Sequence, residues 1–488
     1  MMHSFFYFAI FLEAIYALNW GKQISNAFRK PSMLSSTPAV KTIKNSLPSW
    51  EELKVMSLST ATGTKLKDAR NLNAMGSGPP HTDAEVRLFG TTGEPRVVYY
   101  RDTAAWCPYC QKVWILLEEK QIPYRVKKIN MRSYGDKPAD FLRMVPNGLL
   151  PAIQLDGNPQ TDSLQIMLNL ERTFSGPKHT KMWPTEEDES EMRRAMQLMR
   201  LERESFSAWC SLTFRPSFGG GSRKYFEEVM DEIDRQLNVE EGPWFLSYLS
   251  IVDLTYITHI ERMCASTAYW GGFKLRGEGR WPAIERWMAA FEEMPSYMAT
   301  KSDYYTHIKD IPPQYGPGYP APGWEKLGRV IDGTDPAQGW QLPLPAFSPL
   351  QDAEPVSAAI DPGEESARHE AAFQLLRRPE AVVKFALRGA GQPGAKQFQA
   401  PLADPYAVPD LSYTEDMDAC LRLVTQALLE GYEKISPLVD ETARDTRTRE
   451  KLVSSIQYLR DRIGVPRDMS YPAARQLRAH LNWVANQL

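Results

Sequence analysis

Two cysteines separated by two residues stand in the run Trp106-Cys107-Pro108-Tyr109-Cys110. A thiolate is a strong nucleophile, and a second thiol one helical turn away can attack the mixed disulfide that the first thiol forms. The residue types and their spacing therefore predict thiol–disulfide chemistry at this run.

A buried strand and a helix are expected to position the two thiols. Residues 97–100 form a short, apolar, β-prone run, and the apolar residues after Cys110 recur at helical spacing. Cys107 would then begin the helix, with Pro108 in the first turn, where its missing N–H costs nothing. Because the free N–H groups and positive dipole at a helix N-terminus favour a thiolate, we predict Cys107 as the nucleophile and Cys110 as the resolving thiol.

Half of a zinc site is the alternative interpretation of this cysteine pair. Zinc would need a second pair of ligands at a matching spacing. The other cysteines, Cys210, Cys264 and Cys420, are isolated from one another and from any nearby histidine pair. The sequence therefore favours redox chemistry, and we predict no metal site.

The chain of 488 residues is too long for one hydrophobic core, so several domains are expected. Its formal net charge of −3 gives no general attraction to nucleic acid, and we predict no nucleic-acid partner. The predicted parts are a targeting presequence (1–50), a linker with at most a short helix (51–83), an α/β domain (84–176), an all-helical domain (186–311), a Pro/Gly-rich linker (312–350) and a helical extension (351–488) of unknown role.

Residues 1–50 have the composition of a targeting segment. Residues 5–20 are apolar like a signal h-region, and no acidic residue occurs from Ala14 to Trp50. Together these features resemble the bipartite presequence of algae with complex plastids, with Ala27-Phe28 at the cleavage site. The resemblance implies a plastid protein that keeps no stable membrane span when mature; a mitochondrial presequence or a signal anchor is the alternative.

The α/β domain is predicted to run β-α-β and then β-β-α, which is a thioredoxin-like order. Its expected strands are 97–100, 124–130, 147–155 and a short run after Asp156-Gly157, a strong hairpin signal. Thr161-Asp162-Ser163 then opens a helix. In the helical domain, Ser250 and Asp253 have the spacing of a capping box.

At least four helical segments are predicted in the extension, with a break at Pro379. Their apolar faces would pack on one another or on the preceding domains. Several arginines, Arg478 among them, make the end of the chain locally basic. Because acidic residues are mixed with them, we predict solvated helix faces, and an anion-binding or membrane-surface patch is the alternative.

Three motifs of the α/β domain together resemble the N-terminal domain of glutathione transferases. They are the WCPYC run before a helix, Leu150-Pro151 before the hairpin, and Asp162-Ser163 after it. The thiol motif itself resembles glutaredoxin. The similarity is greatest to the omega-type, cysteine-based class, with dehydroascorbate reductases and cyanobacterial and plastid relatives that have a helical extension. This resemblance implies a thioredoxin-like domain, an all-α transferase domain and an extra all-α extension.

The resemblance also implies a glutathione site around Cys107. Cys107 would face the sulfur of glutathione. The backbone N–H and C=O of Leu150 would bind the cysteinyl part of glutathione, and Pro151 would follow a cis peptide bond. The second thiol, Cys110, is a departure from many omega-type members and opens a dithiol route that they lack.

The ends of glutathione would be held by charged and polar residues. By resemblance, Asp162 and Ser163 would bind the γ-glutamyl end, and Lys137 would meet a glycyl or other carboxylate. The family more often has Glu at the position of Asp162. On the residues alone, Asp162-Ser163 could equally be a helix N-cap, and Lys137 could be a solvated loop residue.

The activity implied by the resemblance is that of a glutathione-dependent thiol transferase or reductase. A Cys107–glutathione mixed disulfide would form, with glutathione as co-substrate and a disulfide, glutathionylated thiol or dehydroascorbate as the oxidised partner. A homodimer is expected from the fold resemblance. One alternative is a non-enzymatic ligand-binding or assembly module, and another is an iron–sulfur cluster ligated by glutathione between two subunits.

Overall fold

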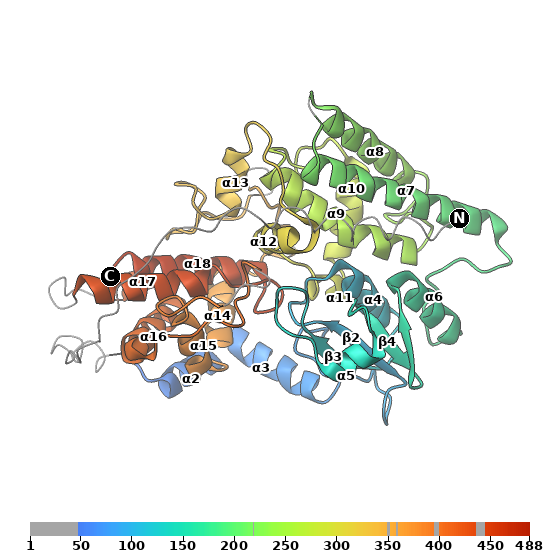
Figure 1. Ribbon diagram of the computed structural model, residues 1–488. Helices are drawn as coiled ribbons and strands as arrows, with labels where there is room; N and C mark the ends of the chain where they lie inside the picture. Colours follow the sequence, from blue (N-terminus) through green and yellow to red (C-terminus); the bar gives the residue numbers. More distant parts are fainter. Residues whose placement is uncertain (1–46, 218, 349–351, 358–359, 395–399, 436–444) are drawn as a thin grey trace. The chain divides into compact units, whose positions relative to one another are not determined.

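The computed structural model of this chain describes residues 47–488, except 218, 349–351, 358–359, 395–399 and 436–444 (Figure 1). Nearly all of the predicted presequence and its Ala27-Phe28 site therefore lie outside the described residues. Among the described residues, the helices are all too short or too polar to cross a membrane.

A five-stranded mixed sheet forms the centre of the α/β domain, with strand order β1-β3-β2-β4-β5. Its strands are β1 (Val86–Arg87), β2 (Val97–Asp102), β3 (Tyr124–Ile129), β4 (Ala152–Leu155) and β5 (Asn158–Thr161). Strands β2 and β3 are parallel, and the other neighbours are antiparallel. The sheet and its helices confirm the predicted thioredoxin-like fold.

Helix α4 (Pro108–Glu119) connects β2 to β3 and is buried along most of its length. Helices α5 (Ala139–Met144) and α6 (Ser163–Thr173) complete this domain. The two-residue strand β1 was not predicted. It is held to α4 by Arg87, whose Nε donates to Glu118 at 2.9 Å in a buried ion pair.

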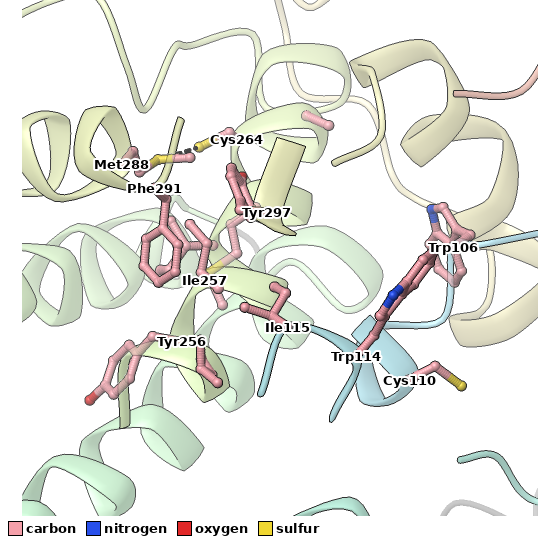
Figure 2. Packing of buried hydrophobic residues seen from close by; sticks show 14 of the residues in the cluster. Trp106, Cys110, Trp114, Ile115, Tyr256, Ile257, Cys264, Met288, Phe291 and Tyr297 are labelled. Atoms are coloured by element: carbon pink, nitrogen blue, oxygen red, sulfur yellow. Dashed lines mark hydrogen bonds between the residues drawn. The ribbon is translucent and has the colours of Figure 1, made fainter. Parts of the chain in front are cut away.

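An all-helical region follows the sheet. It contains α7 (Glu189–Phe214), α8 (Gly221–Leu237), α9 (Ile251–Tyr269), α10 (Pro282–Glu292), α11 (Pro295–Met298), α12 (Tyr304–Tyr315) and α13 (Glu325–Ile331). Residues 251–268 of α9 are all buried, so α9 forms the core of this region. Ile115 of α4 and Ile257 of α9 belong to one hydrophobic cluster, which joins the helical region to the sheet domain (Figure 2).

The predicted capping box at the start of α9 is confirmed. The backbone N–H of Ser250 donates to Asp253 at 2.9 Å, and Trp287 Nε1 donates to the same carboxylate at 3.0 Å. Asp253 is fully buried. The carboxylate therefore fixes both the start of α9 and its contact with α10.

The interval 51–83, predicted as a linker with at most a short helix, instead contains two helices. They are α2 (Trp50–Ser59) and α3 (Ala61–Ala74), capped by Ser49 and Thr60. Neither helix has a continuous apolar stripe, so the sequence pattern did not indicate them. Their support is distant in sequence: Trp50 Nε1 donates to Asp418 at 2.7 Å.

The Pro/Gly-rich interval 312–350 also has more regular structure than predicted. Helix α12 runs to Tyr315 through Pro312 and Pro313, and α13 lies entirely within the interval. The two prolines lack a backbone N–H, so the carbonyls of Ile308 and Lys309 lose their helical donors, but this loss is confined to the end of α12. The Pro312 carbonyl still accepts the N–H of Gly316 at 3.0 Å.

The helical extension forms a second hydrophobic core. Its helices are α14 (Glu364–Leu375), α15 (Pro379–Ala386), α16 (Thr414–Glu430), α17 (Thr446–Arg460) and α18 (Tyr471–Ala485). The predicted break at Pro379 is confirmed, because α15 begins there. The extension also contacts α12 of the all-helical region, since Val465 N–H donates to Thr306 Oγ1 at 3.0 Å and Tyr305 Oη donates to the Asp461 carbonyl at 3.1 Å.

The basic end of the chain differs from the prediction of solvated helix faces. Arg478 is fully buried and donates to Asp303, the N-cap of α12, at 2.6 Å. Its guanidinium also lies over the ring of Tyr305, 4.5 Å from the centroid. Charge pattern alone did not indicate this burial, because the partner lies in another helix far along the chain.

Candidate functional site

The two thiols lie at the N-terminus of α4 in different environments. Cys107 is the N-cap residue and is half-buried, whereas Cys110 is buried. The backbone N–H of Cys110 donates to Cys107 Sγ at 3.4 Å. A sulfur that accepts a helix N-terminal N–H is stabilised as a thiolate. The geometry thus makes Cys107 the accessible sulfur and places Cys110 behind it.

The environment of Cys110 opposes its ionisation. Burial raises the pKa of the Cys110 thiol well above its ordinary value, and the hydrogen bond with Cys107 and the charge of Cys107 add to this effect. A thiol in this state needs a proton acceptor before it can attack a disulfide.

Asp102, the last residue of β2, lies beside both thiols. One carboxylate oxygen of Asp102 and the two sulfur atoms lie within 4.8 Å of one another. Asp102 also accepts the N–H of Trp106 at 2.7 Å, which holds the loop between β2 and α4. The sequence analysis did not single out Asp102. The available signal was an acidic residue at the end of the strand that precedes the motif.

The same three groups could ligate a metal ion. A structural zinc site has four protein ligands. Because Cys210, Cys264 and Cys420 lie outside this group, the described residues supply three. The group lacks the fourth ligand of a structural zinc site, and it places the Asp102 carboxylate beside both thiols.

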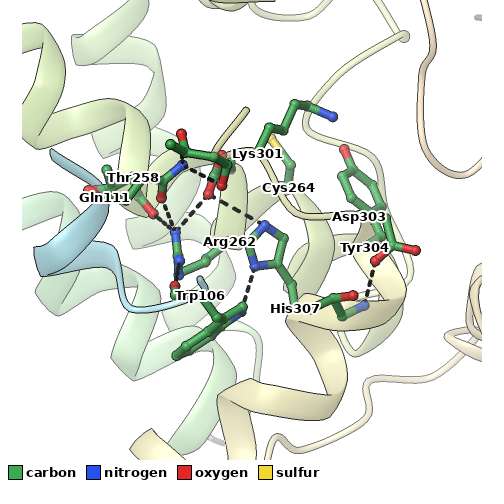
Figure 3. Close-up of polar contacts among 12 residues, drawn as sticks. Trp106, Gln111, Thr258, Arg262, Cys264, Lys301, Asp303, Tyr304 and His307 are labelled. Atoms are coloured by element: carbon green, nitrogen blue, oxygen red, sulfur yellow. Dashed lines mark hydrogen bonds and ion pairs between the residues drawn. The ribbon is translucent and has the colours of Figure 1, made fainter. Parts of the chain in front are cut away.

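A buried polar network holds the motif from behind (Figure 3). Arg262 of α9 donates to the carbonyl oxygen of Trp106 and to Gln111 Oε1, the latter at 3.1 Å. Trp106 Nε1 donates to His307 Nδ1 of α12 at 3.0 Å. Burial, with the nearby positive charges of Arg262 and Lys301, lowers the pKa of His307 well below its ordinary value. His307 therefore stays neutral and accepts the indole N–H.

The residues predicted to bind the peptide part of glutathione follow the motif in the fold. The Leu150–Pro151 peptide bond is cis, as the resemblance implied. Asp162 is the N-cap of α6 and accepts the N–H groups of Leu164 and Gln165 at 3.0 and 3.1 Å. Both bonds go to Oδ1, so the alternative N-cap role of Asp162 is present in the structure. Ser163 is the first residue of α6 and is buried.

Lys137 is half-buried beside Gly148. Its Nζ donates to the carbonyl of Gly148, and burial lowers the pKa of Lys137, whereas the charge of Cys107 acts in the opposite direction. This hydrogen bond ties Lys137 to the loop before Leu150.

A second lysine near the site, Lys112, was not predicted. It lies on α4 and is buried, and burial lowers its pKa to about 8; the charges of Glu202, Asp162 and Cys107 act in the opposite direction. Lys112 Nζ lies 5.3 Å from the centroid of the Tyr109 ring, so its charge is located at the thiol motif. A single lysine on a helix rich in apolar residues does not indicate, from the sequence alone, that its side chain lies at the thiol motif.

Aromatic residues from α7 and α12 form the other side of the motif. The ring centroids of Tyr109 and His259 are 5.7 Å apart, and those of Phe206 and His259 are 5.0 Å apart. The ring centroids of Tyr315 and Trp209 are 5.4 Å apart. Burial lowers the pKa of His259 to about 4, and its Nδ1 lies 2.8 Å from Glu202. His259, to which the sequence assigned no role, is a neutral packing residue with a carboxylate partner.

We expect Lys112→Met to slow the alkylation of Cys107 by iodoacetamide about 3- to 10-fold at pH 7, because a nearby cation stabilises the thiolate. The difference should shrink above pH 8, since the pKa of about 8 means that wild-type Lys112 loses its charge there. Lys65→Met, at an exposed position of α3, is the matched control and should react like wild type. An equal rate for Lys112→Met and wild type at pH 7 would contradict this role.

Comparison with known proteins shows what the sheet domain is similar to. Residues 106–173 match the glutathione S-transferase N-terminal domain. The chain is 28% identical over 203 residues to glutathione S-transferase L3 of Arabidopsis thaliana, covering 41% of this chain and 81% of that protein. It is 26% identical over 155 residues to glutathione S-transferase DHAR2 of Arabidopsis thaliana, covering 32% of this chain and 65% of that protein.

Among solved structures, glutathione transferase Omega 3C of Trametes versicolor is similar at 26% identity, with a TM-score of 0.37. The similarity covers 43% of this chain and 86% of that chain. The family match runs from Trp106 of the thiol motif to Thr173, the last residue of α6.

Proposed function

We propose that this chain, a member of the glutathione S-transferase superfamily, is an omega-like, glutathione-dependent thiol transferase or reductase. The observation that carries the proposal is the half-buried sulfur of Cys107 at the start of α4, which accepts the Cys110 N–H. A cysteine at this position forms mixed disulfides, whereas a conjugating transferase uses a hydroxyl to hold the glutathione thiolate.

In the first step, the Cys107 thiolate attacks the glutathione sulfur of a glutathionylated thiol. The old S–S bond breaks, a Cys107–glutathione disulfide forms, and the released thiolate takes a proton from water. In the second step, the thiolate of another glutathione attacks the bound glutathione sulfur. Oxidised glutathione leaves and Cys107 returns to its thiolate form.

The residues around Cys107 suit a bound glutathione. The backbone of Leu150, before the cis bond to Pro151, would bind the cysteinyl part. The N-terminus of α6 would take the γ-glutamyl carboxylate, since helix N-termini bind anions. Ser163 belongs to that first turn, and Asp162 would pair with the ammonium group. Lys137 would meet the glycyl carboxylate.

A second route would use Cys110 as the resolving thiol. Here Cys110 attacks Cys107 Sγ, releases glutathione thiolate and leaves a Cys107–Cys110 disulfide, which two further glutathione molecules reduce. Asp102 would accept the Cys110 proton, because it is the carboxylate next to both sulfurs. The proposal extends to a plastid location, a homodimer, and a disulfide or dehydroascorbate as the oxidised acceptor.

The proposal is tested by the reduction of hydroxyethyl disulfide and of dehydroascorbate by glutathione, with the full chain as catalyst. Conjugation of glutathione to 1-chloro-2,4-dinitrobenzene and the iron content of the purified protein are measured in parallel. We expect thiol transfer to exceed conjugation. A chain with neither activity and no affinity for glutathione would support the ligand-binding module, and a coloured, iron-containing protein would support the cluster.

We expect Asp102→Asn to slow the release of glutathione from the preformed Cys107–glutathione disulfide about 100-fold in the absence of free glutathione, as for loss of a general base. The release is followed by mass spectrometry after rapid mixing and quenching. Asparagine can still accept the Trp106 N–H, so the loop should keep its position. Unchanged release would exclude Asp102 as the proton acceptor.

A further inference from the structure

A cleft of about 1110 Å³ lies away from the thiol site. It is lined by residues of α3, β1 and β3 and by residues of α14, α15, α17 and α18 of the extension. Its lining includes none of the seven predicted site residues: Cys107, Cys110, Lys137, Leu150, Pro151, Asp162 and Ser163. The cleft is large enough for a small organic ligand, whose sites commonly measure 300–1,000 Å³.

The wall of the cleft carries a surplus of positive charge. Eight arginine and lysine residues line it, against four aspartate and glutamate residues. We call Arg70, Lys128, Arg377 and Arg378 the basic cluster. Asp83 forms an ion pair with Arg377 and lies 3.8 Å from Lys128 Nζ, so one carboxylate serves two cations.

Two members of the basic cluster have no such partner. The side chains of Arg70 and Arg378 form no ion pair or hydrogen bond with other described residues. Partial desolvation and the positive charges of Arg377 and Arg378 lower the pKa of the exposed Arg70, and burial together with Arg101 lowers that of Lys128; the Asp83 carboxylate acts in the opposite direction on both. Like charges that crowd a cleft repel one another, and a bound anion would relieve this repulsion.

Another pair of cations lines the cleft next to Tyr458. Arg388 donates to the carbonyl of Asp404 at 3.1 Å, and Arg462 lies over the Tyr458 ring at 3.5 Å. The Nε atom of Arg462 is buried and has no hydrogen-bond partner among the described residues. It is therefore a donor that an oxygen of a bound ligand could satisfy.

The remainder of the lining is largely apolar. It includes Leu375, Val382, Phe385, Leu402, Leu459 and Leu477. A small inorganic anion would satisfy the cations alone. An anion with an apolar body would satisfy both the cations and this apolar wall.

We propose that the cleft binds an amphipathic organic anion, with phosphate or carboxylate groups at the basic cluster and an apolar body against the extension. The ligand would contact both the sheet domain and the extension, because the lining comes from both. It therefore gives the extension a role in ligand binding that is independent of the proposed thiol chemistry.

The test is isothermal titration of the full chain with octyl phosphate, octanoate and octanol, which share one chain and differ in the head group. Inorganic phosphate is titrated separately. We expect both anions to bind, octyl phosphate more tightly than octanoate, and octanol and inorganic phosphate at least about 10-fold more weakly than octyl phosphate. Octanol binding as tightly as octyl phosphate, or absence of binding by both amphipathic anions, would overturn the proposal.

Variants locate the site. The double variant Arg70→Gln, Arg378→Gln should weaken octyl phosphate at least about 5-fold through loss of two charge-assisted contacts. Both residues are exposed, so the variant should melt like wild type. The matched control is Arg193→Gln, Arg235→Gln, which removes two exposed arginines of α7 and α8. Equal weakening by the two double variants, or displacement of octyl phosphate by saturating glutathione, would contradict this site.

Discussion

Replacing Cys107 by serine is expected to lower glutathione-dependent reduction of a mixed disulfide by at least ~100-fold, as for loss of a nucleophile. Serine is close in size to cysteine, and Cys107 is half-buried, so the fold should survive. The hydroxyl cannot form a disulfide, and therefore no glutathione adduct should appear by mass spectrometry. Conjugating activity gained by Cys107→Ser would further support the role assigned to this sulfur.

The variant Cys110→Ser separates the two resolving routes. In excess glutathione we expect it to keep its rate within about 10-fold of wild type, because the half-buried Cys107 is open to a second glutathione. Thiol transfer that survives in Cys107→Ser would refute the role of Cys107. Loss of activity in both variants would mean that Cys110 is required.

Cys210→Ser is the matched control for these substitutions. Cys210 is half-buried like Cys107, but it lies on α7, and burial raises the pKa of its thiol to about 12. A thiol in this state is a poor nucleophile at neutral pH. Its replacement should leave the reduction rate unchanged, which would show that a serine substitution by itself does not impair the enzyme.

The thiol motif and its supporting elements could be predicted because their signals are local. Pro108 marks the first turn of α4, and Asp156-Gly157 marks the hairpin between β4 and β5. Ser250 and Asp253 have the spacing of a capping box, which marks the start of a helix. Each signal depends on residues within a few positions of one another, so one sequence contains the whole of it.

The residues that hold the motif could not be predicted in this way. Arg262 is 156 residues from the Trp106 carbonyl that it binds, and His307 is 201 residues from the Trp106 indole. On their own helices both look like ordinary polar positions. Only the packing of α9 and α12 against α4 gives them their partners, and no local pattern encodes that packing.

The helices α2 and α3 were missed for a related physical reason. Most helical stability in proteins comes from tertiary packing of one face. For α2 the partner is α16, through Trp50 and Asp418, and the two residues are 368 positions apart. A polar segment that packs on a surface far along the chain is therefore predicted as a linker from the sequence.

Arg478→Met is expected to lower the free energy of unfolding by about 3–5 kcal/mol, as when one partner of a buried ion pair is removed. Arg478 donates to Asp303 at 2.6 Å, and both side chains are buried. Without Arg478, the buried Asp303 side chain would lose its ion-pair partner. Chemical denaturation of the full chain measures the loss.

The matched control is Arg193→Met, which removes an ion pair between exposed residues of α7. Its partner Glu189 is 3.1 Å away, and both side chains are mostly in solvent. Surface pairs of this kind contribute about 0–1 kcal/mol. Arg193→Met should therefore unfold almost like wild type, and a loss equal to that of Arg478→Met would mean that burial of the pair is unimportant.

The double variant Arg478→Met, Asp303→Asn should recover part of the stability, because asparagine keeps the cap of α12 but removes the buried charge.

Asp303 begins the helix that carries His307, and His307 holds Trp106 next to Cys107. The same ion pair thus connects α18 of the extension to the thiol motif. We expect Arg478→Met to slow alkylation of Cys107 and the double variant to restore it. A stable Arg478→Met protein with wild-type alkylation would show that the extension does not support the site.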